Sequence, residues 1–183
     1  MQLICETPRL KLQCLNSNSA LAVRNFYQEN KTYFDPYELT RPSGFYTVDY
    51  QASFLEWEWK EMLAKRCLRY FLFLKEDPDK VIGAVNFSDI RFGCMQKASL
   101  GYKIHHDYWN QGFAYEACLK CLEIIFQEYE LHRVEAHIAP SNLPSIHLIE
   151  KLGFAYEGLQ VQSAQINHQW QDLFLYAKLN PDQ

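Results

Sequence analysis

Hydrophobic and polar positions follow two different periods along this chain, and together they predict a mixed fold. Residues 9–15 alternate apolar and polar side chains, which indicates a strand with one buried face. Apolar residues recur at helical spacing over 51–66 and again from 114 to 125, which predicts two amphipathic helices. The other predicted elements are helices at 19–29 and 143–152 and strands at 69–75, 80–90, 98–104, 134–139, 154–162 and 170–179.

The order of these elements predicts one α/β domain. Asp77 and Pro78 lie in a polar turn between two strands, so 69–75 and 80–90 should form a hairpin, with 98–104 as the third strand of a meander. Strands and helices in this order predict a sheet with helices on both faces. A length of 183 residues fits a single domain, and the most irregular stretch, 33–48, reads as a loop within it.

Composition narrows the class of protein. Hydrophobic residues make up 48% and charged residues 22%, which predicts a folded core rather than disorder. The net charge of -4 argues against a nucleic-acid binder and favours a basic or cationic partner. No apolar run is long enough to span a bilayer, and the first residues lack a signal core, so we expect a cytoplasmic protein that does not enter the membrane. The six cysteines should be reduced thiols, and Cys118 and Cys121 lie on an apolar helical stripe, which favours core packing over zinc.

Two segments carry candidate chemistry, and each opens a helix after a strand. In 108–117, YWNQGFAYEA, free backbone N–H groups around Gly112 would bind an anion at a helix N-terminus. In 139–154, Asn142 is a helix cap, and Ser145 lies on the same side of the first turn. Two helix starts at two strand ends suggest one cleft.

These segments belong to a wider set of motifs. They are TPRLKL at 7–12, VIGAVNF at 81–87, LGYKI at 100–104, YWNQGFAYEA at 108–117, LHRVEAHIAPSNLPSIHLIEKLGFAYEG at 131–158 and WQDLFLYAKL at 170–179. With this set the chain resembles the GNAT superfamily of acetyl-CoA-dependent N-acetyltransferases, in the branch of the ribosomal-protein N-terminal acetyltransferases of the RimJ/RimL type. The resemblance implies one acetyltransferase domain over residues 1–183, with a mixed, mostly antiparallel sheet of about seven strands.

The resemblance also implies where acetyl-CoA binds. Strands 100–104 and 134–139 would splay apart around the pantetheine arm, and acetyl would pass directly to an amine in a ternary complex, with no acyl-enzyme and no metal. Ser145 would be the acid that protonates the leaving thiolate. The implied contacts with the cofactor are Tyr102, Lys103, Ile104, Trp109, Asn110, Gln111, Gly112, Phe113, Ala114, Asn142 and Ser145.

Three positions depart from the family pattern. Trp109 stands where the family's phosphate loop usually has Gln or Arg, which implies that backbone amides carry more of the binding. Ile149 replaces a tyrosine that many members use as the acid, which favours Ser145 for that role. The terminal hairpin at 168–172 lacks the usual Gly-x-Trp-x-Asp pattern, which leaves its turn geometry open.

The predicted strand 134–139 carries the two candidates for the catalytic base. Glu135 and His137 share the face opposite the apolar residues, and a histidine titrates in the range of a general base, although a surface histidine explains His137 equally well. Glu116, in a first helical turn, and Asp172 are candidates to contact a cationic substrate, but the dipole and a basic neighbour would explain them too. His105 and His106 should point apart if they lie on a strand, so no shared metal site is expected.

The lack of an evident strong base favours an α-amine as the acceptor. At pH 7 a lysine amine of pKa about 10.4 is about 0.04% neutral, whereas an α-amine of pKa about 7.8 is about 14% neutral. We therefore expect a peptide or protein N-terminus. A polyamine, amino sugar or antibiotic amine is the alternative, and a non-catalytic acyl-CoA sensor is a third. The stretch 34–50 and helix 51–66 should wall the acceptor site in a monomer or a homodimer.

Overall fold

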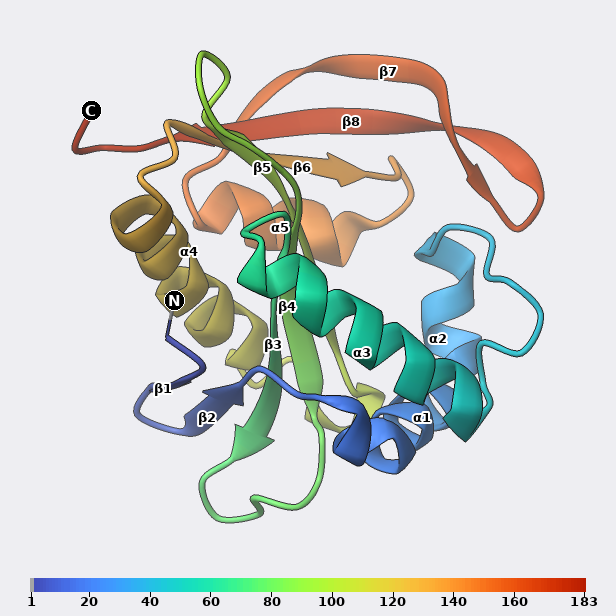
Figure 1. The fold of residues 1–183 in the computed structure, drawn as a ribbon. Coiled ribbons are helices and arrows are strands. Elements are labelled where there is room, and N and C mark those ends of the chain that lie inside the picture. The colour runs from blue at the N-terminus through green and yellow to red at the C-terminus, as the bar shows by residue number, and fades with distance from the viewer. Residues whose placement is uncertain (1) are drawn as a thin grey trace.

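The computed structural model describes residues 2–183 and consists of one eight-stranded sheet with helices on both faces (Figure 1). The strands are β1 (Ile4–Glu6), β2 (Leu10–Gln13), β3 (Leu68–Leu74), β4 (Gly83–Arg91), β5 (Lys97–Ile104), β6 (Arg133–Ile138), β7 (Ala155–Ile166) and β8 (Gln169–Leu179). The α-helices are α1 (Ala20–Glu29), α2 (Lys31–Phe34), α3 (Val48–Leu63), α4 (Phe113–Tyr129) and α5 (Leu143–Lys151). The fold class is confirmed, with one strand more than expected.

The sheet order is β1-β2-β3-β4-β5-β6-β8-β7. All neighbouring strands are antiparallel except β5 and β6, which are joined through α4 and are parallel. The predicted hairpin of β3 and β4 and the meander into β5 are confirmed. Residues 4–6 were not predicted as a strand, because three residues are too few for a clear period. The predicted loop at 33–48 is in part helical, since α2 reaches into it.

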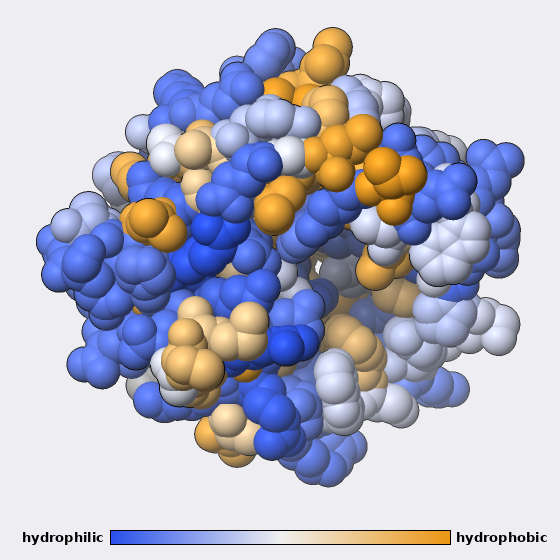
Figure 2. Space-filling model, turned by 90° about the horizontal axis from the view of Figure 1, so that it is seen from above, coloured by the Kyte–Doolittle hydropathy of each residue, from blue (hydrophilic) through white to orange (hydrophobic). Residues whose placement is uncertain are grey.

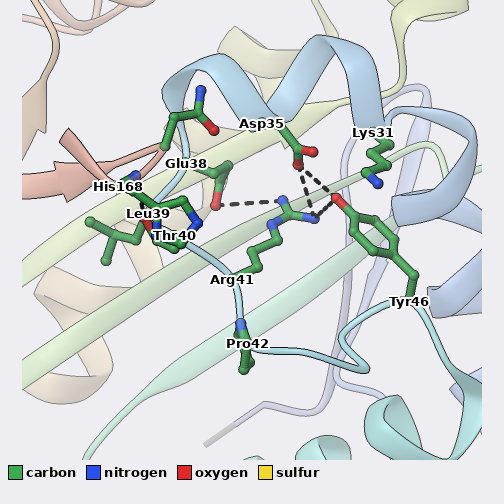
Figure 3. Close-up of a pocket in the computed structure, with 10 residues that line it drawn as sticks. Lys31, Asp35, Glu38, Leu39, Thr40, Arg41, Pro42, Tyr46 and His168 are labelled. Atoms are coloured by element: carbon green, nitrogen blue, oxygen red, sulfur yellow. Dashed lines mark hydrogen bonds and ion pairs between the residues drawn. The ribbon is translucent and has the colours of Figure 1, made fainter.

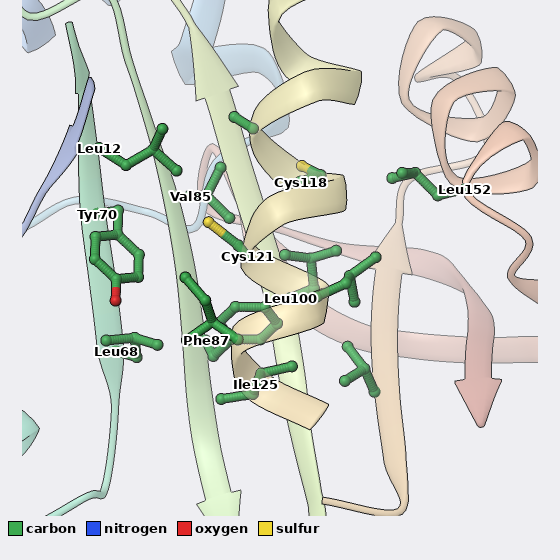
Figure 4. Packing of buried hydrophobic residues seen from close by; sticks show 14 of the residues in the cluster. Leu12, Leu68, Tyr70, Val85, Phe87, Leu100, Cys118, Cys121, Ile125 and Leu152 are labelled. Atoms are coloured by element: carbon green, nitrogen blue, oxygen red, sulfur yellow. The ribbon is translucent and has the colours of Figure 1, made fainter. Parts of the chain in front are cut away.

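Alternation along the strands divides the core between the two faces. On one face α1 and α3 pack on β3 and β4, with Phe71 and Phe73 buried beneath them. On the other face α4 covers Tyr70, Phe87 and Leu100, and α5 packs beside it against β6 (Figure 4). Cys118 and Cys121 lie in this second layer with no exposed surface, as their apolar stripe predicted, and burial raises the pKa of both thiols.

The β7–β8 hairpin closes with a tight turn at Asn167 and His168. Both residues have positive φ, 48° and 62°, as the two central residues of a type I′ turn do. The hairpin therefore forms a type I′ turn although it lacks the glycine of the family pattern. The hairpin end rests on the segment after α2, because Leu39 bridges Ile166 and the Thr40 N–H donates to the Gln165 carbonyl at 3.1 Å. Sequence positions 125 residues apart are thereby joined.

No helix within residues 2–183 is both long enough and apolar enough to cross a membrane.

Candidate active site

The parallel pairing of β5 and β6 stops partway along both strands. Pairs form at Lys97 with Arg133, Ala98 with Val134 and Ser99 with Glu135, and none follows although both strands continue. A gap therefore opens between β5 and β6 beyond Ser99, within an otherwise continuous sheet. The predicted splay of these two strands is confirmed.

The backbone of β5 presents unpaired groups to this gap. The His105 N–H donates to the Ile82 carbonyl on the β4 side at 2.8 Å, and alternate residues of an antiparallel strand point to opposite edges. The backbone groups of Tyr102 and Ile104 therefore point away from β4 and into the gap. Those of Lys103 point back to β4, which differs from the expectation that this residue faces the cofactor.

Backbone amides at the start of α4 form a cradle at the open end of the gap. Gly112 caps the helix with φ of 81°, and Asn110 also has a positive φ of 58°. In the described chain, no backbone N–H from Asn110 to Ala114 donates to another residue, as expected for the first turn of a helix. The positive end of the α4 dipole adds to these free donors. This geometry suits a pyrophosphate, as the sequence predicted.

Two side chains hold the cradle in shape. The Trp109 indole N–H donates to the Ile104 carbonyl at 2.7 Å, so this side chain turns toward β5 and not toward the cradle. The Gln111 side chain donates to the Asp107 carbonyl at 3.0 Å. Both bonds fix the path of the loop, and they leave the binding of an anion to backbone amides.

Arg9 and Glu116 join the start of β2 to the cradle. Arg9 donates through Nη1 to the Gln111 carbonyl at 2.9 Å and stacks on Phe113 at 4.2 Å. Glu116 accepts from the Thr7 hydroxyl at 2.5 Å and from Arg9 Nε at 2.7 Å. Burial works against the charge of Glu116, but these bonds outweigh it and hold its pKa below the usual value. Glu116 was expected to contact substrate, but its carboxylate is bonded to Thr7 and Arg9 and joins two elements of the fold. Sequence reasoning did not identify Arg9 as the cation beside the cradle.

The other side of the loop is fixed by the junction of α1 and α2. The buried Asn30 side chain accepts from both the backbone N–H and Nδ1 of His106, each at 2.8 Å, and donates to the Phe26 carbonyl. Glu29 lies 3.1 Å from Nε2 of the buried His105, and Tyr33 stacks on His106. The cradle is therefore bound to the helices of the opposite face.

His105 and His106 do not point apart, and that expectation was wrong. The strand ends at Ile104, and the two rings stack with centroids 4.6 Å apart and planes at 19°. Their nitrogens and the Asp107 carboxylate lie within 4.8 Å of one another. Their contacts with Glu29 and Asn30 explain the cluster as support for the loop.

The start of α5 lies on the α4 side of the gap. Asn142 caps the helix by accepting from the Ser145 N–H at 3.3 Å. The Tyr102 hydroxyl donates across the gap to the Ser145 carbonyl at 3.1 Å, and burial raises its pKa, which keeps it a donor. The Ser145 hydroxyl and the Asn142 amide N–H groups form no bonds within the described chain and are available to a ligand.

On the opposite face, His137 and Glu135 differ sharply. His137 is exposed, and its Nδ1 lies 2.9 Å from the Gln160 side-chain oxygen. An N–H at Nδ1 would satisfy that contact and leave the lone pair on Nε2. Glu135 is buried and bound by Lys97 at 2.9 Å and Arg133 at 2.8 Å, and these bonds hold its pKa below the usual value although burial alone would raise it. Nε2 of His137 lies 3.8 Å from Glu135 Oε2, and of the two candidate bases only His137 is exposed.

A hollow of about 210 Å³ lies between the segment after α2 and the turn of the β7–β8 hairpin (Figure 3). Arg41 lies at its centre and donates to the Tyr46 hydroxyl at 2.9 Å, which in turn donates to Asp35 at 2.6 Å. Glu38 pairs with Lys103 at 2.6 Å, and this pair outweighs burial to keep the pKa of Glu38 low. Residues within 35–46 form most of its wall, whereas no residue of the predicted helix 51–66 lines it.

Asp172 lies outside this hollow. Its Oδ1 accepts from the Gln162 N–H at 2.8 Å, where β7 bulges against β8. The bond satisfies a backbone group that the bulge removes from the ladder. The side chain expected to contact substrate therefore shapes the hairpin.

Comparison with known proteins agrees with this geometry. The family described as "Acetyltransferase (GNAT) domain" matches residues 9–155, which is most of the chain. The probable N-acetyltransferase YjcK of Bacillus subtilis is 34% identical over 154 residues, with 84% of each chain covered. The [ribosomal protein uS5]-alanine N-acetyltransferase of Escherichia coli is 29% identical over 177 residues, which cover 96% of this chain and 90% of that protein.

Solved structures give the same fold. The ribosomal-protein-S5-alanine acetyltransferase of Vibrio fischeri superposes with a TM-score of 0.93 at 24% identity, covering 99% of this chain and 98% of that one. RimJ of Mycobacterium smegmatis, solved with CoA-disulfide, has a TM-score of 0.87 at 22% identity and covers 94% of this chain and 83% of that one. The chain belongs to the GNAT acetyltransferase family. It is an N-acetyltransferase, and its relatives include enzymes named for acetylating a ribosomal protein.

Proposed function

We propose that this N-acetyltransferase binds acetyl-CoA in the gap between β5 and β6 and transfers acetyl to the α-amine of a peptide or protein. The observation that carries the proposal is the early end of the β5–β6 pairing, with the unpaired backbone groups of Tyr102 and the N–H of Ile104 along one edge and the free amides of 110–114 at its open end. A linear arm that ends in a pyrophosphate matches both features, and the related RimJ was crystallised with CoA-disulfide.

In this mechanism the chain positions two reactants, and no covalent enzyme intermediate forms. The neutral amine attacks the thioester carbonyl, the new C–N bond forms, and the C–S bond breaks. Ser145 would give a proton to the leaving thiolate, and Nε2 of His137 would take the proton lost by the amine, directly or through water. Backbone N–H groups of β5 in the gap would polarise the carbonyl.

The α-amine is favoured over a lysine amine by the lack of a strong base. Glu135 is held ionised by two cations, and His137 is the remaining candidate on that face. An α-amine is partly neutral at pH 7, so it depends less on a catalytic base for deprotonation than a lysine amine of pKa about 10.4 does. The names of the related uS5-alanine enzymes support the same class of acceptor.

The first test is thermal stability with and without acetyl-CoA. At about a hundredfold excess over Kd, a ligand of the folded state adds about 2.7 kcal/mol, which should raise Tm by about 5 to 10 °C. An unchanged Tm would contradict binding in the gap.

The second test is CoA release with added amines. We expect turnover with peptides that begin with Ser or Ala, and none with the same peptides carrying a blocked N-terminus and a free lysine. Turnover with spermidine alone would contradict the α-amine and favour a small-molecule amine.

A further inference from the structure

Asn86 is a polar residue that the sequence motifs included without a role. It lies on β4 between Arg69 of β3 and Gly101 of β5, on the sheet face covered by α1 and α3. Its side chain is half-buried. Gly101 lies two residues beyond Ser99, where the β5–β6 pairing ends, so Asn86 lies beside the point at which the gap opens.

The absence of a side chain at Gly101 brings the Asn86 amide against β5. A Cβ on Gly101 would lie 3.0 Å from Asn86 Oδ1 and 3.2 Å from Nδ2, closer than ordinary packing allows. The amide therefore occupies the space next to the β5 backbone. The cradle at Gly112 lies beyond Ile104, and the three residues from Ile104 back to Gly101 span about 10 Å. An arm bound by the cradle would run along β5 toward Gly101.

The surrounding polar side chains on this face are paired with one another. Arg69 lies 3.1 Å from the buried Glu58, and Lys103 is bonded to Glu38. Glu135 is bonded to Lys97 and Arg133. By contrast, the Asn86 side-chain amide forms no hydrogen bond within the described chain. Its carbonyl oxygen and its N–H groups can therefore bind a ligand, whereas the neighbouring charged side chains are already paired.

An amide suits a reacting amine better than a carboxylate does. Its carbonyl oxygen accepts one N–H without stabilising the protonated, non-nucleophilic form as a negative charge would. We propose that Asn86 is a substrate-binding residue whose Oδ1 accepts an N–H of the acceptor amine and directs its lone pair toward the thioester in the gap. This assignment rests on the proposed acetyl transfer.

The test compares Asn86→Ala with Ser88→Ala, an exposed position on the same strand and the same face. We expect Asn86→Ala to lower kcat/KM for the acceptor about tenfold while Kd for acetyl-CoA stays within about twofold. Ser88→Ala should change neither. Equal kcat/KM for Asn86→Ala and the wild type would overturn the assignment, and so would a parallel loss of acetyl-CoA affinity.

A second variant tests the interaction with the amine itself. Asn86→Asp should raise the pKa of a bound amine, because a negative charge favours the ammonium, so the rise of kcat with pH, which reports groups in the bound complex, should shift to higher pH. A purely structural role would not move this profile, and an unmoved profile would overturn the assignment. The wild type distinguishes the proposed function from the proposed role of Asn86. If the wild type releases no CoA when an amine is added, the proposed function is overturned. If it releases CoA normally and Asn86→Ala does the same, only the role of Asn86 is overturned.

Discussion

The proposed cofactor side and the proposed acceptor side of the gap are built from different kinds of groups. The cofactor side presents backbone groups that form no bonds within the described chain, namely those of Tyr102 and the N–H groups of 110–114. The acceptor side presents charged side chains that are already paired, such as Lys103 with Glu38. Backbone groups can bind a common cofactor whatever side chains the sequence carries. Discrimination between acceptors, by contrast, requires the few side chains that are not already paired. Specificity for the amine should therefore depend on few residues.

The largest effect should come from Ser145, whose hydroxyl lies open on the α5 side of the gap. Ser145→Ala should lower kcat about a hundredfold if the serine protonates the thiolate, with the Kd of acetyl-CoA unchanged. The N-cap survives, because Asn142 accepts from the backbone N–H. Ser141→Ala, at an exposed position in the same loop, is the control in single-turnover measurements. Unchanged turnover with chemistry rate-limiting would remove Ser145 from this role.

A smaller effect is expected at the cradle. Gly112→Ala forces a side chain into positive φ at a cost of about 1 to 2 kcal/mol, and its Cβ would lie 3.4 Å from Arg9 Nη2. We expect Kd for acetyl-CoA to rise about tenfold by calorimetry. Gly93→Ala has the same backbone strain, φ 71°, with open space around it, far from the cradle in the β4–β5 turn. It should lower Tm and leave Kd unchanged, and equal affinity losses in both variants would show a global effect.

The smallest effect on catalysis is expected at Glu135, whose ion pairs we interpret as structural. Glu135→Gln should keep kcat within about threefold. Its effect on stability should depend on pH. The pKa of the folded-state carboxyl is lowered, so its stabilisation is complete above the unfolded pKa of about 4.3 and is lost as pH falls through the folded value.

Urea unfolding at several pH values checks this. The difference in unfolding free energy between wild type and Glu135→Gln should be largest near neutral pH and should shrink toward pH 3. Glu56→Gln removes an exposed pair with Lys60 and should show little change at any pH. A constant difference for Glu135→Gln would mean that its ion pairs do not stabilise the fold.

The sequence predicts the cofactor side well because its signals are local. A glycine that opens a helix, a cap at Asn142 and the alternation in β5 are each contained in a few neighbouring residues. Because each of the two helices opens after the end of a strand, the sequence also suggests that their starts share one cleft. The family resemblance adds the splay, which no local pattern contains.

The side-chain contacts that support the cradle and the acceptor side could not be predicted in the same way, because they join distant positions. Glu29 and His105 are 76 residues apart, and Lys103 and Glu38 are 65 apart. Periodicity assigns each residue to a face but does not say which charges meet. For this reason Glu116 could be read as a substrate contact until its bonds to Thr7 and Arg9 were known.

The buried Asn30 has a consequence for how the two reactants affect each other. Its side chain fixes His106 in the loop that leads to the cradle, and Asn30 immediately precedes α2, which leads to the hollow around Arg41. We propose that the acceptor binds in this hollow; it would then order α2 and with it the loop, so we expect each ligand to tighten the binding of the other. Thermodynamic linkage requires the two factors to be equal. Heterotropic cooperativity between cofactor and amine would then arise from one asparagine, without any change of fold.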